Sequence, residues 1–136
     1  MATIKSYTDI EQSKKLAEML PLESADMYYP WYIEEDGDTI ESGHRISTPN
    51  IGDFITHKVN KMILPCWSLA ALRNLLPVAI KVNENTYLFE SHNTFDKSWV
   101  YRYYNEDDVS YLYCKDTNEV DACVAMIEKL HESNLL

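Results

Sequence analysis

Glycine is scarce in this chain, which contains only 3 among its 136 residues. Loops that bind phosphate through backbone N–H groups need closely spaced glycines, and the sequence has no G-x-G-x-x-G, Walker or G-x-S-x-G motif. We therefore exclude nucleotide binding through these routes.

Cysteine and histidine are also few, and their spacing suits neither a disulfide framework nor a zinc site. The 3 cysteines are an odd number without a C-x-x-C pair, which is typical of a protein from a reducing compartment. The 4 histidines stand far apart and form no H-x-x-x-H motif. We accordingly expect a cytoplasmic protein that binds no metal and carries no cofactor.

Basic residues are outnumbered, at 12 lysines and arginines against 22 acids, and the net charge is −10. Nucleic-acid phosphates and anionic lipids both need a positive surface, so we expect no nucleic acid and no membrane as a partner. No apolar run is long enough to span a membrane, and the first residues lack the apolar segment of a signal peptide. A neutral or basic protein partner is compatible with this charge.

The chain does contain enough hydrophobic residues, at 46%, for the core of one domain over residues 1–136. Its longest apolar run, residues 64–77, has a proline near each end. Leucines recur there on one helical face, Pro65 suits a first turn, and Pro77 ends the run. These features predict a buried helix over residues 66–76.

Two more helices are predicted at the ends of the chain. Residues 118–132 repeat apolar side chains at i, i+3, i+4 and i+7, and Thr117 or Asn118 can cap the first turn. Residues 9–20 carry a weaker apolar stripe behind the capping box Thr8-Asp9-Ile10-Glu11. The C-terminal helix therefore offers the larger core-facing surface.

Between the central and final helices, apolar residues recur at every second position, which predicts strands. Polar turns separate four short runs, so we expect an antiparallel meander in a two-layer α+β fold, with the central and final helices covering one face. The predicted strands are residues 78–82, 86–91, 98–104 and 109–115. The predicted core comprises Leu69, Leu72, Leu76, Val78, Ile80, Val82, Val124, Ile127 and Leu130.

The segment between residues 23 and 41 differs from the rest, because it has seven acids, no base and several aromatic side chains. Aromatic anchors, combined with charge that steers a basic partner, are typical of a docking surface. Our leading hypothesis is therefore a non-enzymatic protein-interaction module, and a solvated loop is the alternative for this segment. The residues predicted to make the interaction are Tyr28, Tyr29, Trp31, Tyr32, Glu34 and Glu35.

Self-association as a homodimer is a second version of this hypothesis. In it, an aromatic face of the sheet pairs with its copy across a two-fold axis. The polar, turn-rich residues 42–63 are the part whose structure the sequence indicates least.

Two blocks of the sequence resemble recurring segments of a known family. The first runs from Leu64 to Pro77 and contains PCWSLAAL, and the second is VDACVAMIEKLHE at residues 120–132. Both are similar to segments of a family of short uncharacterised proteins from bacterial prophages and other mobile elements, and residues 13–27 are similar as well. The resemblance implies a shared fold and genetic context, and it brings no catalytic motif.

A local likeness indicates an alternative function, that of a cysteine hydrolase or transferase. Cys66 followed by Trp67 is similar to the nucleophile helix of papain-like and transglutaminase-like enzymes. A helix N-terminus lowers a thiol pKa, His92 can take the proton, and Asp108 or its neighbour Asp107 can orient that histidine. Against this, the spacing from Cys66 to His92 is short for those families and no glycine precedes Cys66. A small thiol buried in the core is the favoured interpretation.

Overall fold

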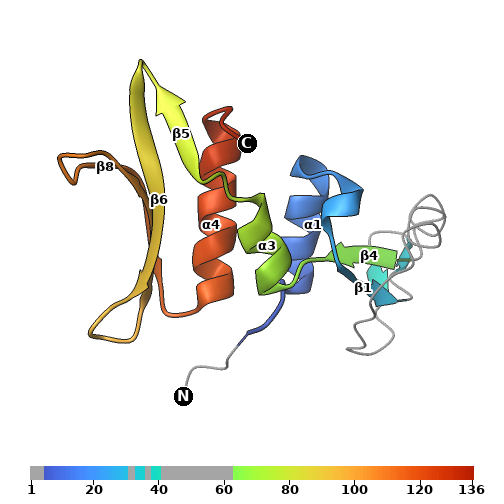
Figure 1. The fold of residues 1–136 in the computed structure, drawn as a ribbon. Helices are drawn as coiled ribbons and strands as arrows, with labels where there is room; N and C mark the ends of the chain where they lie inside the picture. Colours follow the sequence, from blue (N-terminus) through green and yellow to red (C-terminus); the bar gives the residue numbers. More distant parts are fainter. Residues whose placement is uncertain (1–4, 31–32, 36–37, 41–62) are drawn as a thin grey trace. The chain divides into compact units, whose positions relative to one another are not determined.

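The computed structural model describes residues 5–30, 33–35, 38–40 and 63–136 (Figure 1), and at the borders of the gaps it describes the backbone alone. These residues form two compact units, an N-terminal unit of Tyr7–Ala71 and a C-terminal unit of Met1–Ser6 with Leu72–Leu136. We describe the two units separately. The expectation of one domain over residues 1–136 stays a prediction.

The described residues of the N-terminal unit include an α-helix and two antiparallel pairs of strands. Helix α1 (Ile10–Met19) is followed by the short 3-10 helix η1 (Leu22–Ser24) and by strand β1 (Met27–Pro30), which pairs with strand β4 (Ile63–Cys66). Strands β2 (Ile33–Glu35) and β3 (Asp38–Ile40) form a second antiparallel pair. One core cluster among the described residues of this unit consists of Tyr29, Leu64 and Cys66, with Tyr7, Ile10 and Met27 packed against it.

The central helix is shorter than the sequence predicts. Helix α3 spans only Leu69–Leu75, and Cys66 lies in strand β4 instead. Pairing with β1 gives this segment backbone hydrogen bonds along one edge, which favours a strand here. The helix follows Ser68, whose hydroxyl accepts a hydrogen bond from the Ala71 N–H at 3.1 Å and caps the first turn. The prediction that the helix begins at residue 66 is wrong. Cys66 pairs with Met27 of β1, which is distant in sequence, and the helix begins only at Leu69.

The cap of helix α1 also differs from the predicted one. Asp9 accepts a hydrogen bond from the Gln12 N–H at 2.8 Å, and the Gln12 side chain accepts one from the Asp9 N–H at 3.1 Å. Thr8 is buried, and its hydroxyl accepts a hydrogen bond from the Trp67 N–H at 3.1 Å. The capping box therefore uses Asp9 and Gln12, because Thr8 joins the helix to the segment after β4.

The C-terminal unit is a four-stranded antiparallel sheet with a long final helix (Figure 1). Its strands follow the chain in the order β5 (Ala79–Val82), β6 (Asn85–Asn93), β7 (Trp99–Tyr104) and β8 (Ser110–Asp116). Helix α4 (Glu119–Glu132) comes last, and the Asn118 side chain caps it by accepting from the N–H groups of Val120 and Asp121. The predicted meander, the α+β class and the C-terminal helix are confirmed.

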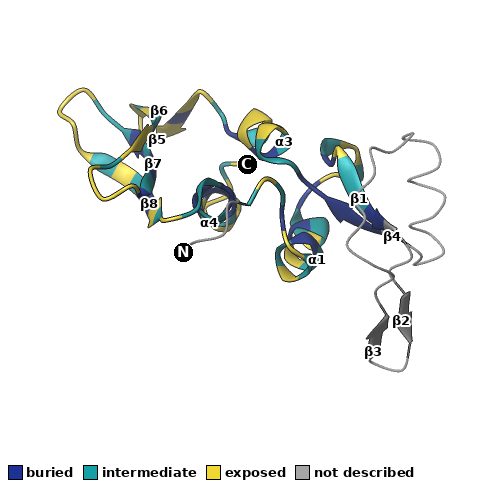
Figure 2. Cartoon of the chain, turned by 90° about the horizontal axis from the view of Figure 1, so that it is seen from below, coloured by how far each residue is buried: buried dark blue, intermediate teal, exposed yellow. Residues whose placement is uncertain are grey.

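Helix α4 packs against β7 and β8, and buried residues lie on the strands of this sheet (Figure 2). Tyr101 and Tyr103 are fully buried there, and Cys114 lies opposite Tyr101 on the neighbouring strand. Burial of this face is what makes short strands stable. The buried members of the predicted core are Leu72, Leu76, Ile80, Val124, Ile127 and Leu130.

Three residues of the predicted core lie elsewhere. Val78 is 83% exposed, because it lies between Pro77 and the first residue of β5, Ala79, and so stands outside the strand. Val82, at the end of the strand, and Leu69, in the N-terminal unit, are half-buried. The predicted core therefore extends a few residues too far toward each turn.

Candidate functional site

The sheet of the C-terminal unit has a second face, which points away from α4. Alternate residues of β6, β7 and β8 share it, because side chains along a strand alternate between the two faces. We name this surface the outer face. Leu88 is 48% exposed there and Tyr113 is 47% exposed, whereas Val100 is buried. The outer face comprises Leu88, Glu90, His92, Val100, Arg102, Tyr104, Tyr113 and Lys115.

Arg102 organises the centre of the outer face. Its Nη2 donates to Glu90 Oε2 at 2.9 Å and to Asp108 Oδ1 at 2.7 Å. Its guanidinium carbon lies 4.7 Å from the centre of the Tyr104 ring, which is the geometry of a cation–π contact. The hydrogen bond from Arg102 also holds the pKa of Glu90 below its ordinary value. These contacts hold the Tyr104 ring and the Glu90 carboxylate in place on an exposed surface.

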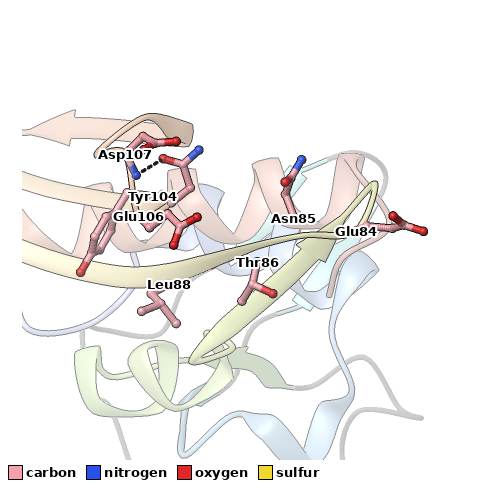
Figure 3. Close-up of a pocket in the computed structure, with 8 residues that line it drawn as sticks. Glu84, Asn85, Thr86, Leu88, Tyr104, Glu106 and Asp107 are labelled. Carbon is pink, nitrogen blue, oxygen red and sulfur yellow. Dashed lines mark hydrogen bonds between the residues drawn. The ribbon is translucent and has the colours of Figure 1, made fainter.

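A pocket of about 440 Å³ lies at the end of the outer face where the β5–β6 and β7–β8 turns meet (Figure 3). Leu88 and Tyr104 face each other across β6 and β7 and supply its apolar wall. The turns supply the rim, and Asn105 fixes one of them by accepting from the N–H groups of Asp107 at 3.0 Å and Val109 at 2.9 Å. The lining residues are Glu84, Asn85, Thr86, Leu88, Tyr104, Asn105, Glu106 and Asp107.

The rim of this pocket is acidic. Glu84, Glu106 and Asp107 are exposed, and none of the three forms an ion pair within the described part of the chain. The pocket thus combines an apolar wall with carboxylates that form no ion pair among the described residues. This combination suits a ligand side chain with an apolar body and a positive charge.

The opposite end of the sheet presents a fully exposed aromatic side chain, Phe95, in the β6–β7 turn. The turn is closed by hydrogen bonds from Thr94 N to Ser98 O at 2.7 Å and from Lys97 N to Thr94 O at 2.9 Å. Asp96 accepts from the Ser98 N–H and forms an ion pair with Lys115 at 3.2 Å. These contacts hold the backbone of the turn while Phe95 projects into solvent.

The structure places the alternative catalytic residues in different settings. Cys66 is completely buried in β4 of the N-terminal unit, and its thiol donates to the Thr8 carbonyl oxygen at 3.5 Å. Burial raises the pKa of the Cys66 thiol, and no helix begins at this residue, so the premise of a thiol activated by a helix N-terminus is wrong. In the C-terminal unit, His92 bonds to Glu90 and Asp108 bonds to Arg102.

The residues predicted for the interaction fall into two groups. Tyr29 is buried, and its hydroxyl donates to the Thr8 carbonyl oxygen at 2.7 Å, so it belongs to the core of the N-terminal unit and not to a docking surface. Tyr28 is half-buried on the same strand. Four other positions of this hypothesis lie where the structure describes no side chains, namely Trp31, Tyr32, Glu34 and Glu35.

One polar cluster of the C-terminal unit had no signal in the sequence. Arg73 of α3 donates to the Tyr101 hydroxyl at 2.8 Å and to Glu119 at 2.6 Å, and Tyr101 donates to the same Glu119 carboxylate at 2.6 Å. Burial and the bond to Glu119 raise the pKa of Tyr101. The three side chains come from three elements far apart in sequence, so local periodicity could not bring them together.

Across the described ranges, no helix is long and apolar enough to cross a membrane. In the same residues, no group of three or more histidine, cysteine, aspartate or glutamate side chains could hold a metal ion. No family model, no curated protein and no solved structure matches the chain.

Proposed function

We propose that this chain is a non-enzymatic protein-interaction module, and that it binds a segment carrying one apolar and one basic side chain on the outer face of its sheet. The observation that carries the proposal is the pocket in which the Leu88–Tyr104 pair meets three acidic rim residues. An origin in phages or other mobile elements belongs to the same proposal and is supported by the sequence resemblance alone.

The chemistry of the pocket defines the segment it suits. Leu88 and Tyr104 offer apolar surface to an aromatic ring or to the methylene stem of a lysine or arginine. Glu84, Glu106 and Asp107 attract the positive charge at the end of that stem, and the net charge of −10 speeds the encounter with a basic partner. Ion pairs at so exposed a site are each worth about 1 kcal/mol or less, so we expect weak, reversible binding.

The test uses short peptides blocked at both ends, one with phenylalanine and lysine and a matched one with glutamate in place of lysine. Amide chemical shifts of the labelled protein are followed during titration at low protein concentration. We expect saturable shifts at residues 84–88 and 104–107 with the lysine peptide only. Equal shifts with the two peptides, or shifts that do not saturate, would contradict the proposal.

A pair of charge variants sharpens the test. Glu106→Gln with Asp107→Asn should weaken lysine-peptide binding by several fold, because it removes two rim carboxylates. Glu18→Gln with Glu132→Gln makes the same change in net charge at two exposed positions that do not line the pocket and should leave binding unchanged. Equal losses in both double variants would show general charge attraction without a site.

A further inference from the structure

We infer that the segment bound by this pocket is the β6–β7 turn of a second copy of the chain, so that two copies pack outer face to outer face across a two-fold axis. This inference rests on the proposed function, because it names the partner of the same pocket. Each copy then places Phe95 and Lys97 against the pocket of the other.

The meander places the two complementary features at opposite ends of the sheet. The β5–β6 and β7–β8 turns, which form the pocket, lie at one end, and the β6–β7 turn that carries Phe95 lies at the other. A two-fold axis parallel to the sheet and perpendicular to the strands exchanges the two ends. It therefore brings each β6–β7 turn to the pocket of the other copy, and both contacts form at once.

The spacing along β6 suits this arrangement. The strand continues from Leu88 to Asn93 and the turn follows, which at about 3.3 Å per residue sets the pocket about 17 Å from the base of the turn. An axis crossing β6 near Ser91 lies midway between Leu88 and Phe95. Sheets packed face to face stand about 10 Å apart, which is a distance that a phenyl ring and a lysine stem can bridge.

The chemistry of the turn matches that of the pocket. Phe95 is fully exposed and can pack on Leu88 and Tyr104, while Lys97 brings a cation to the acidic rim. Within the residues described, Lys97 forms no ion pair of its own. The closed turn is already ordered, so binding it costs little conformational entropy.

The size of the face sets the strength of the association. Its three strands, at about 4.8 Å spacing and about 20 Å length, cover about 290 Å², roughly a third of what a standard interface buries on each partner. The net charge of −10 on each copy opposes the association further. We therefore expect a dimer with a dissociation constant of about 0.1 to 1 mM.

Light scattering and sedimentation between about 10 µM and 2 mM test the association, with a rise from monomer to dimer mass expected. Phe95→Ser should keep the monomer mass over this range, whereas the matched control Leu136→Ser, at another exposed apolar position, should dimerise like the parent. A constant monomer mass for the parent chain overturns the inference. Dimerisation that Phe95→Ser leaves intact also overturns it, because another surface must then be responsible.

A charge exchange tests the reciprocal geometry. Lys97→Glu alone should stay monomeric, and Glu106→Lys with Asp107→Lys alone should stay monomeric, because each places like charges in contact. An equimolar mixture of the two variants should dimerise, since the turn made acidic by Lys97→Glu then meets the basic rim, and the unchanged Lys97 turn meets the acidic rim. Failure of the mixture to associate, with all variants folded by circular dichroism, contradicts the arrangement.

The two proposals can fail separately. The peptide titration is made at a concentration where the chain is monomeric, so it reports on the pocket alone. If the lysine peptide binds and the parent chain never dimerises, the pocket stands and its partner is another protein. If both hold, the lysine peptide should also shift the dimer toward monomer, because it competes with the turn.

Discussion

The Tyr101 hydroxyl donates to the Glu119 carboxylate at 2.6 Å and thereby joins the middle strand β7 to the first turn of α4. Arg73 donates to both groups, so α3 is tied to the same point. Hydrogen bonds that involve a charged partner are among the stronger ones in proteins, and here three elements depend on one cluster. The cluster therefore fixes how the helices meet the buried face of the sheet.

We predict that Tyr101→Phe lowers the free energy of unfolding by about 1 to 2 kcal/mol. The loss should be at the lower end, because Arg73 and Glu119 still bond to each other at 2.6 Å. Urea unfolding followed by circular dichroism measures it. Tyr113→Phe removes a hydroxyl from an exposed position on the outer face and should change stability by less than about 0.5 kcal/mol.

Leu72→Ala and Ile127→Ala should each cost about 2 to 5 kcal/mol, because both side chains are fully buried and their removal leaves a cavity. The same urea experiment applies, with Leu136→Ala as an exposed control. A cost below about 1 kcal/mol at either buried position would show that the core can collapse around the gap.

Stability should fall in alkaline solution. Burial raises the pKa of Cys123 to about 12 and raises the pKa of Tyr103, whereas in the unfolded chain such groups titrate near about 8.5 and 10. At a pH between the unfolded-state pKa and the folded-state pKa of each group, the unfolded chain binds fewer protons than the folded chain. The free energy of unfolding therefore decreases as pH rises. We expect full stability below about pH 8 and a progressive loss from about pH 9 to 12.

Urea midpoints at several pH values measure this loss. Cys123→Ala should reduce the loss of stability between about pH 9 and 10, because the thiol of the unfolded chain ionises before the tyrosine hydroxyl does. A midpoint that is flat over the whole alkaline range would contradict the prediction.

The thiols should react slowly in the folded protein. Cys66, Cys114 and Cys123 are all buried, and burial raises the pKa of each. A thiol-specific chromogenic reagent at neutral pH should therefore titrate them at the rate of unfolding, and all three at once in denaturant. Rapid reaction of Cys66 alone in the native chain would instead revive the cysteine-nucleophile alternative.

Periodicity in the sequence was sufficient for the strand order and the final helix of the C-terminal unit. Alternation places Tyr101 and Tyr103 on one face of β7 and Arg102 and Tyr104 on the other, and the structure confirms both faces. The final helix is determined locally as well, because its apolar residues and the Asn118 cap interact with residues only a few positions away in the sequence. Such features depend only on neighbours in the chain, which is why the sequence determines them.

Tertiary structure decided what depends on distant partners. Cys66 begins the helix that the sequence predicts, yet it lies in β4, because β1, more than thirty residues earlier, pairs with this segment through backbone hydrogen bonds. For the same reason Asp9 and not Thr8 caps α1, because the Thr8 hydroxyl accepts a hydrogen bond from the distant Trp67 N–H. The pocket also arises only when two turns meet at one end of the sheet and bring Leu88 and Tyr104 beneath an acidic rim. Sequence periodicity does not predict these long-range contacts, because the free energy that stabilises them comes from residues that meet only in the folded chain.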